Sequence, residues 1–95
     1  MPRNPAEIMT ALARQFPALK KAPGVDPWEP AILDEWAASD RQSIGTRIVV
    51  RFLLAVWNGS PDYWKSGPFL IRDLGQLDDE NLEAWKTWAA RPFFL

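Results

Sequence analysis

Few side chains in this 95-residue sequence could do chemistry, because it contains neither cysteine nor histidine. The chain therefore lacks a thiol nucleophile, a zinc finger and the most common general base. Lys65 and Ser66 come closest to a lysine–serine nucleophile pair. Adjacent residues in a Gly-Pro loop rarely converge beside an oxyanion hole, so the pair does not predict catalysis. We expect no catalytic residue and no enzymatic activity.

An acidic stretch late in the sequence is a candidate for holding Mg²⁺ or Ca²⁺, which need several converging oxygen ligands. Its members are Asp73, Asp78, Asp79, Glu80 and Glu83. Their spacing lacks the alternating ligands, central glycine and terminal glutamate of an EF-hand loop. Asp78 fits a helix N-cap better, with the next two acids in the first helical turn. The five glycines are scattered and form no phosphate-binding loop. We expect no metal and no cofactor.

Three arginines could contact an anionic partner. Arg47 and Arg51 are four residues apart and share a helix face, and Arg41 lies just upstream. A helix-turn-helix interpretation would make residues 32–38 the first helix and residues 43–57 the recognition helix. That second helix has almost no hydrogen-bonding side chains for base edges. A helical DNA-binding regulator that uses these arginines is therefore the alternative function.

The formal net charge of −1 conceals charged blocks. Residues 25–40 carry five acidic residues and no basic one, whereas residues 1–24 carry four basic residues and one acidic residue. Residues 41–59 carry three arginines and no acid. We expect Asp34 and Glu35 to face outward and to pair with the arginines of the neighbouring block. The alternative is a surface divided into acidic and basic patches that orients a partner.

Aromatic residues are the better candidates for binding, because large rings are common interface anchors. The chain has six Trp, five Phe and one Tyr. Trp28 is flanked by prolines, Tyr63 and Trp64 lie in a predicted loop, and Phe93 and Phe94 belong to an apolar tail. We predict that these five residues contact a partner, although the tail could instead fold back onto its own domain. The other tryptophans lie on helix faces and are predicted to be core residues: Trp36, Trp57, Trp85 and Trp88.

Apolar periodicity and capping residues predict the elements that carry these side chains. The first helix begins after Asn4. Residues 20–30 are interpreted as a connector, although residues 26–30 could equally be the first turn of the second helix, with Asp26 as its N-cap and Pro27 as its first residue. The last helix begins after Asp78. The predicted helices cover about residues 5–16, 27–39, 42–58 and 79–91, with a short apolar segment at 69–74.

The third helix is the most apolar part of the chain. Its run of β-branched residues at 48–50 raises a strand alternative, but a stretch of about 17 residues without a breaker favours a helix. Val50 and Leu54 lie in line with its arginines, opposite its main apolar face. Either neighbouring helices or a second chain must cover them. In the latter case Val50 and Leu54 would be partner-binding residues.

These observations predict an all-α fold, a small single-domain bundle (residues 1–95) of four main helices and a short fifth segment around the central helix. No run of 18 apolar residues and no apolar signal-peptide core is present, so we expect a cytoplasmic location and no membrane partner. The predicted function is that of a non-enzymatic accessory or regulatory protein. It would contact a protein partner, or a second copy as a homodimer, through aromatic anchors.

Overall fold

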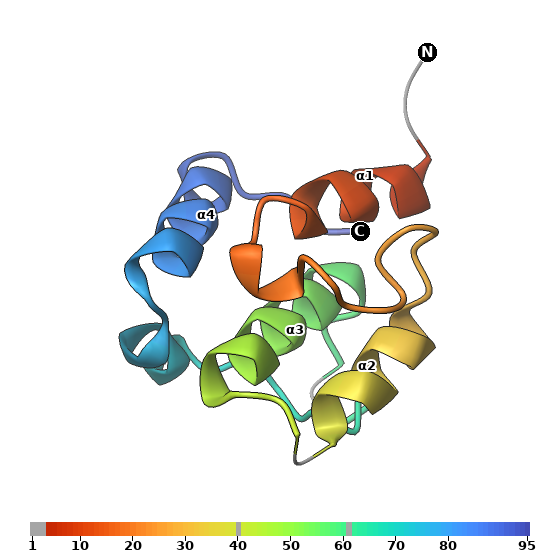
Figure 1. The fold of residues 1–95 in the computed structure, drawn as a ribbon. Coiled ribbons are helices and arrows are strands. Elements are labelled where there is room, and N and C mark those ends of the chain that lie inside the picture. Colours follow the sequence, from red (N-terminus) through yellow and green to blue (C-terminus); the bar gives the residue numbers. More distant parts are fainter. Residues whose placement is uncertain (1–3, 40, 61) are drawn as a thin grey trace.

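Helices account for all regular structure in the computed structural model, which describes residues 4–39, 41–60 and 62–95. Within these ranges there are four α-helices, two short 3₁₀-helices and no strand (Figure 1). The all-α prediction is confirmed, and residues 48–50 are helical. None of the helices in these ranges is long and apolar enough to cross a bilayer. The elements are α1 (Pro5–Ala13), η1 (Pro17–Leu19), α2 (Pro30–Ala38), α3 (Ile44–Trp57), η2 (Ile71–Gln76) and α4 (Asp79–Ala90).

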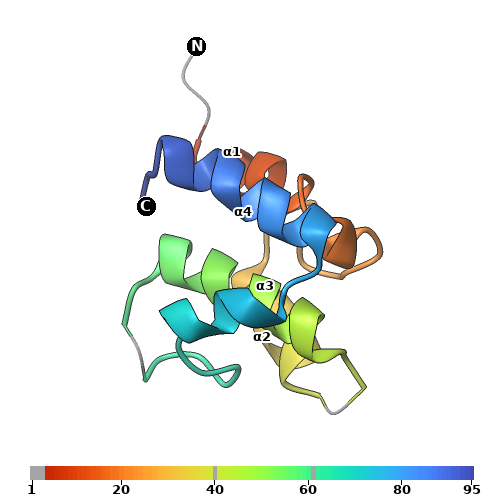
Figure 2. The ribbon, with the colours of Figure 1, turned by 90° about the vertical axis from the view of Figure 1, so that its left-hand side faces the viewer.

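The helix α3 forms the centre of the molecule. Figures 1 and 2 show α1 and α4 at the same level on one side of it, with α2 on another side. Both 3₁₀-helices also contact α3. A helix that is contacted on several sides buries most of its surface, which explains why its sequence is apolar nearly all round. Its buried residues are Ile48, Val49, Val50, Phe52, Leu53, Leu54 and Val56.

Val50 and Leu54 are both 0% exposed. The neighbouring elements of the same chain therefore cover the face on which they lie, which is the first of the two predicted alternatives, and Val50 and Leu54 are not the exposed partner-binding residues of the second alternative. The physical reason is the central position of α3, which buries both side chains within their own chain.

Local capping chemistry sets three of the four α-helix starts. Asn4 accepts a hydrogen bond from the backbone N–H of Glu7 at 2.9 Å, and Asp78 accepts one from Asn81 at 2.9 Å. Ser43 caps α3 in the same way. Side chains of these types satisfy the free N–H groups of a first helical turn. The N-caps predicted at Asn4 and Asp78 are therefore confirmed.

The start of α2 agrees with the connector alternative and contradicts the alternative in which Asp26 is the N-cap. The helix begins at Pro30, and Asp26 forms an ion pair with Arg14 instead of capping α2. Gly24 has a φ of +82°, and a Cβ there would lie 2.7 Å from the carbonyl oxygen of Glu29. The chain before α2 thus turns back tightly through a conformation that glycine adopts most easily. This long-range arrangement overrides a capping pattern that is favourable locally.

The tryptophans follow the prediction only in part, since the four that were expected in the core pack against it while Trp28 belongs to it. Trp28, expected at the surface, is only 6% exposed and belongs to the core. Its ring centroid lies 5.9 Å from that of Trp57. The tryptophans expected in the core are half-buried around its edge instead. Phe52 occupies the middle of the aromatic packing, and its ring contacts those of Phe16, Phe69, Trp85 and Trp88.

Candidate functional site

Two segments that are distant in the sequence are each hydrogen-bonded to the end of α3. The indole N–H of Trp64 donates to the carbonyl oxygen of Asn58 at 3.2 Å, and the backbone N–H of Leu95 donates to the carbonyl oxygen of Val56 at 2.9 Å. Figure 2 shows the tail above the end of α3, beside α4, and the loop after α3 running downward from it. We call these two segments together the aromatic end. It comprises Tyr63, Trp64, Phe93, Phe94 and Leu95.

The aromatic end holds two exposed rings in the same manner. Tyr63 is 66% exposed, and its ring meets that of Trp64 edge-on at a centroid distance of 4.6 Å. Phe94 is 70% exposed and meets Trp88 edge-on at 5.6 Å. Each of these tryptophans is half-buried and donates its indole N–H to a backbone carbonyl, which for Trp88 is that of Phe93 at 3.2 Å. Both exposed rings thus rest on a tryptophan that the chain holds in place.

The tail contacts its own chain, which was one of the two alternatives for it. Phe93 is half-buried and packs against the core, whereas Phe94 and Leu95 remain exposed. The exposure of Tyr63 and Phe94 is compatible with the predicted contact to a partner, which stays a prediction. The sequence did not indicate that Trp88 supports Phe94, because that contact depends on how the chain turns after α4.

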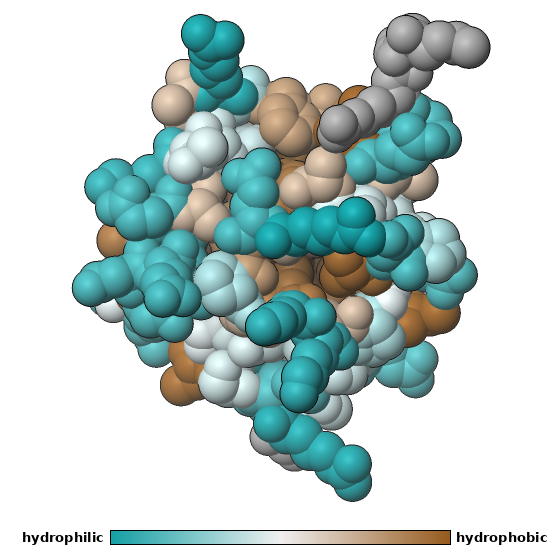
Figure 3. All heavy atoms as spheres, turned by 45° about the horizontal axis from the view of Figure 1, so that its top comes forward, coloured by the Kyte–Doolittle hydropathy of each residue, from teal (hydrophilic) through white to brown (hydrophobic). Residues whose placement is uncertain are grey.

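A groove lies between α1 and residues 17–28, which we call the α1 groove. It consists of two hollows of about 490 Å³ and 530 Å³, and both are lined by Arg14 and Asp26. Figure 3, in which the side carrying α1 comes forward, shows apolar atoms at the bottom of a hollow with hydrophilic side chains around and across it. Neither Arg14 nor Asp26 was a candidate from the sequence.

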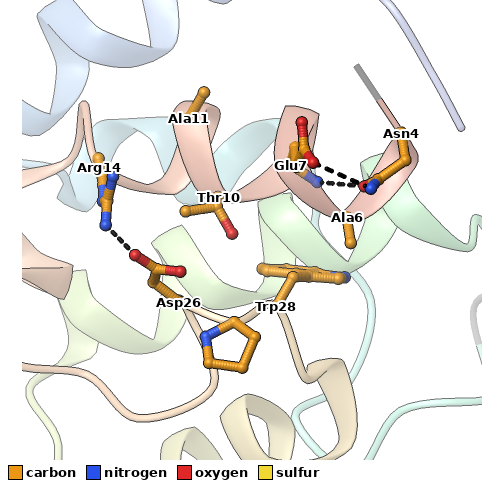
Figure 4. A pocket seen from close by; sticks show the side chains of 9 residues that line it. Asn4, Ala6, Glu7, Thr10, Ala11, Arg14, Asp26 and Trp28 are labelled. Carbon is orange, nitrogen blue, oxygen red and sulfur yellow. Dashed lines mark hydrogen bonds and ion pairs between the residues drawn. The ribbon is translucent and has the colours of Figure 1, made fainter.

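Two links join the walls of the α1 groove at its middle. The hydroxyl of Thr10 donates to the carbonyl oxygen of Val25 at 2.5 Å, and Arg14 pairs with Asp26 (Figure 4). Thr10 in α1 and Arg14 at its C-cap are four residues apart and so lie on the same face of the helix. This spacing is visible in the sequence, but nothing local shows which segment the face would meet.

Apolar side chains form the floor of the α1 groove on both sides of these links. Trp28 lies below α1 in one hollow (Figure 4), and Phe16, Leu19 and Val25 line the other. The indole nitrogen of Trp28 is buried and has no hydrogen-bond partner among the described residues. Trp28 is thus part of the floor of the α1 groove, whereas Tyr63 and Trp64, which were predicted to act with it, do not line this groove.

The arginines of α3 hold loops of their own chain. Arg47 donates to the carbonyl oxygen of Ser39 at 3.0 Å, and Arg51 donates to that of Ser66 at 2.6 Å. Arg51 also lies 3.9 Å from Asp73. The side chains of Arg47 and Arg51 are thereby turned toward neighbouring segments, whereas Arg41 is exposed. No specific observation favours the DNA-binding alternative.

Asp34 and Glu35 have different roles. Glu35 is exposed as expected, but Asp34 is buried and accepts hydrogen bonds from the backbone N–H groups of Lys65 (3.0 Å) and Ser66 (2.8 Å). The prediction that Asp34 faces outward is wrong, because the loop after α3 packs over that side of α2. The hydroxyl of Ser66 donates to the carbonyl oxygen of Asp34 at 3.1 Å, so it too stabilises this contact.

The acidic stretch does not converge. Among the described residues, no group of three or more carboxylates lies close enough to hold a metal ion. Comparison of the chain with protein-family models, with curated proteins and with solved structures finds no match. The aromatic end and the α1 groove are therefore the surfaces from which function must be argued.

Proposed function

We propose that this chain is a non-enzymatic accessory or regulatory protein that contacts a partner protein through its aromatic end. The observation that carries the proposal is that Tyr63 and Phe94 are held in the same way, each by a neighbouring tryptophan. Each ring is about two-thirds exposed, and each packs edge-on against a half-buried tryptophan whose indole N–H is bonded to the backbone.

Rings held in this way suit binding for a thermodynamic reason. A side chain that is already ordered loses little conformational entropy when a partner covers it. Aromatic residues also dominate the few positions that carry most of the free energy of protein interfaces. Because they are about two-thirds exposed, Tyr63 and Phe94 can each still bury roughly 100–170 Å². Together they would supply about a third of the roughly 800 Å² that each partner contributes to a standard interface.

The same residues would form the contact whether the partner is another protein or a second copy of this chain. Measurement of molar mass over a concentration series distinguishes these cases. If the chain self-associates through the aromatic end, the double variant Tyr63→Ala/Phe94→Ala should stay at the monomer mass of 10.8 kDa when the unmodified chain forms dimers.

For a different protein partner, the test is quantitative capture from an extract of the source cells, followed by affinity measurement with the captured protein. Truncation of two interface anchors should weaken binding by about 30-fold or more. The matched control is Leu70→Ala/Ile71→Ala, which removes two exposed apolar side chains outside the aromatic end. The proposal fails if both double variants bind as tightly as the unmodified chain, or if both lose affinity equally.

A further inference from the structure

We propose that the α1 groove is a second binding site, and that its occupant is an extended segment of a protein with a defined order of side chains. The segment carries two apolar side chains, one for each hollow. A basic residue of the segment lies at the Glu7 end of the groove, and an acidic residue lies at the Lys20 end. This site is separate from the aromatic end, so the two proposals can fail independently.

The floor of the α1 groove explains the two apolar side chains. The ring of Trp28 and the side chains of Phe16, Leu19 and Val25 offer apolar surface, but the links at Thr10 and Arg14 divide it into two hollows. In an extended chain, side chains two residues apart point to the same side at a spacing of about 7 Å. Such a pair can enter adjacent hollows while the residue between them lies over the links.

Shape and hydrogen bonding favour an extended segment. The groove follows α1, which is about 14 Å long, and continues past its end, because the residues that line the second hollow lie between 14 and 26 and none belongs to α1. An extended chain needs at least about four to five residues for such a length. An extended backbone also presents carbonyl groups that are not bonded within the segment. The indole N–H of Trp28 has no acceptor among the described residues, but its nitrogen is buried, so a carbonyl of the segment reaches it only if the side chains around it move.

The charges at the rim set the orientation. The hollow over Trp28 is lined by Glu7, and the hollow over Phe16 is lined by Lys20, while the Arg14–Asp26 pair lies between them and is neutral as a pair. One end of the groove is therefore anionic and the other cationic. A segment with a basic residue at the first end and an acidic residue at the second complements both.

The Arg14–Asp26 pair is no obstacle to the occupant. Both side chains are more than half exposed, and exposed ion pairs contribute little to stability. When an occupant crosses the middle of the groove, the pair can therefore separate at small loss.

The test uses three blocked pentapeptides as probes. They are acetyl-Lys-Leu-Ala-Leu-Glu-amide and its two like-charged analogues, one with lysine at both ends and one with glutamate at both ends. Binding is followed by NMR titration of the Trp28 indole N–H resonance, which is assigned with the variant Trp28→Phe. We expect this resonance to shift, and the mixed-charge peptide to bind about fivefold tighter than either analogue.

A charge reversal in the protein checks the assignment of the two ends. Lys20→Glu should make the peptide with two lysines the tightest ligand. The matched control Lys21→Glu makes the same change at the next exposed residue, which does not line the groove, and should leave the original preference intact. Equal affinity for all three peptides, an unmoved Trp28 resonance at millimolar peptide, or no change of preference in Lys20→Glu would each overturn the proposal.

Discussion

The carboxylate of Asp34 joins two segments that are about thirty residues apart. It accepts the backbone N–H groups of Lys65 and Ser66, while Ser66 returns a hydroxyl hydrogen bond to the carbonyl of Asp34. Arg51 reaches the same loop through the carbonyl oxygen of Ser66. A single buried carboxylate thus fixes the start of the loop that runs from the aromatic end to η2.

Replacement of Asp34 should therefore destabilise the fold. The variant Asp34→Ala leaves two backbone N–H groups without their acceptor, and the free energy of unfolding should fall by about 3 kcal/mol. Urea denaturation measures the change. The control is Glu35→Ala, which removes an exposed carboxylate from the same helix and should change stability by less than about 0.5 kcal/mol. Equal midpoints for the two variants would contradict the role assigned to Asp34.

Among the elements, α3 is the one on which the others depend. Leu54 is completely buried within it, so an ionised carboxylate at this position would lose its hydration without gaining a partner. Leu54→Asp should lower stability by more than about 4 kcal/mol, which approaches the whole stability of a small domain. We expect a chain without native circular dichroism at 25 °C.

The contrasting variant is Leu70→Asp, which places the same charge at an exposed leucine and should keep the native spectrum. A soluble, folded monomer for Leu54→Asp would show that this side of α3 is not covered by its own chain. It would restore the interpretation that Val50 and Leu54 form an interface between chains.

The elements also show how far the sequence alone can be interpreted. The four main helices and the caps at Asn4 and Asp78 were predicted, because periodicity and capping depend on residues within a few positions of each other. The outward orientation of Asp34 and the exposure of Trp28 were wrong. Asp34 is buried because the loop at residues 65–66 packs over α2, and Trp28 is buried because it packs against Trp57 of α3. The α1 groove was missed for the same reason, since its walls are joined by contacts between distant residues, Thr10 with Val25 and Arg14 with Asp26.

At the scale of the whole molecule, hydrogen bonds join segments that are distant in the sequence. The backbone N–H of Ala18 in η1 donates to the side-chain oxygen of Asn81 in α4 at 3.2 Å, and Leu95 bonds to Val56 at the end of α3. The radius of gyration is 12.2 Å. This is close to the roughly 12 Å expected for a folded chain of this length. The chain is thus packed as tightly as an ordinary globular domain.

This arrangement leads to a prediction about cooperativity. Since α1, α2, η1 and η2 contact α3, and α4 is joined to η1, no element can leave without exposing part of the common core. Urea unfolding followed by tryptophan fluorescence and by far-UV circular dichroism should give coincident two-state transitions, which would support the prediction of a single domain. The variant Asn81→Ala removes the bond to Ala18 and should shift both transitions by the same amount. Separate midpoints, or a shift confined to one signal, would instead show that α4 unfolds independently of the rest of the molecule.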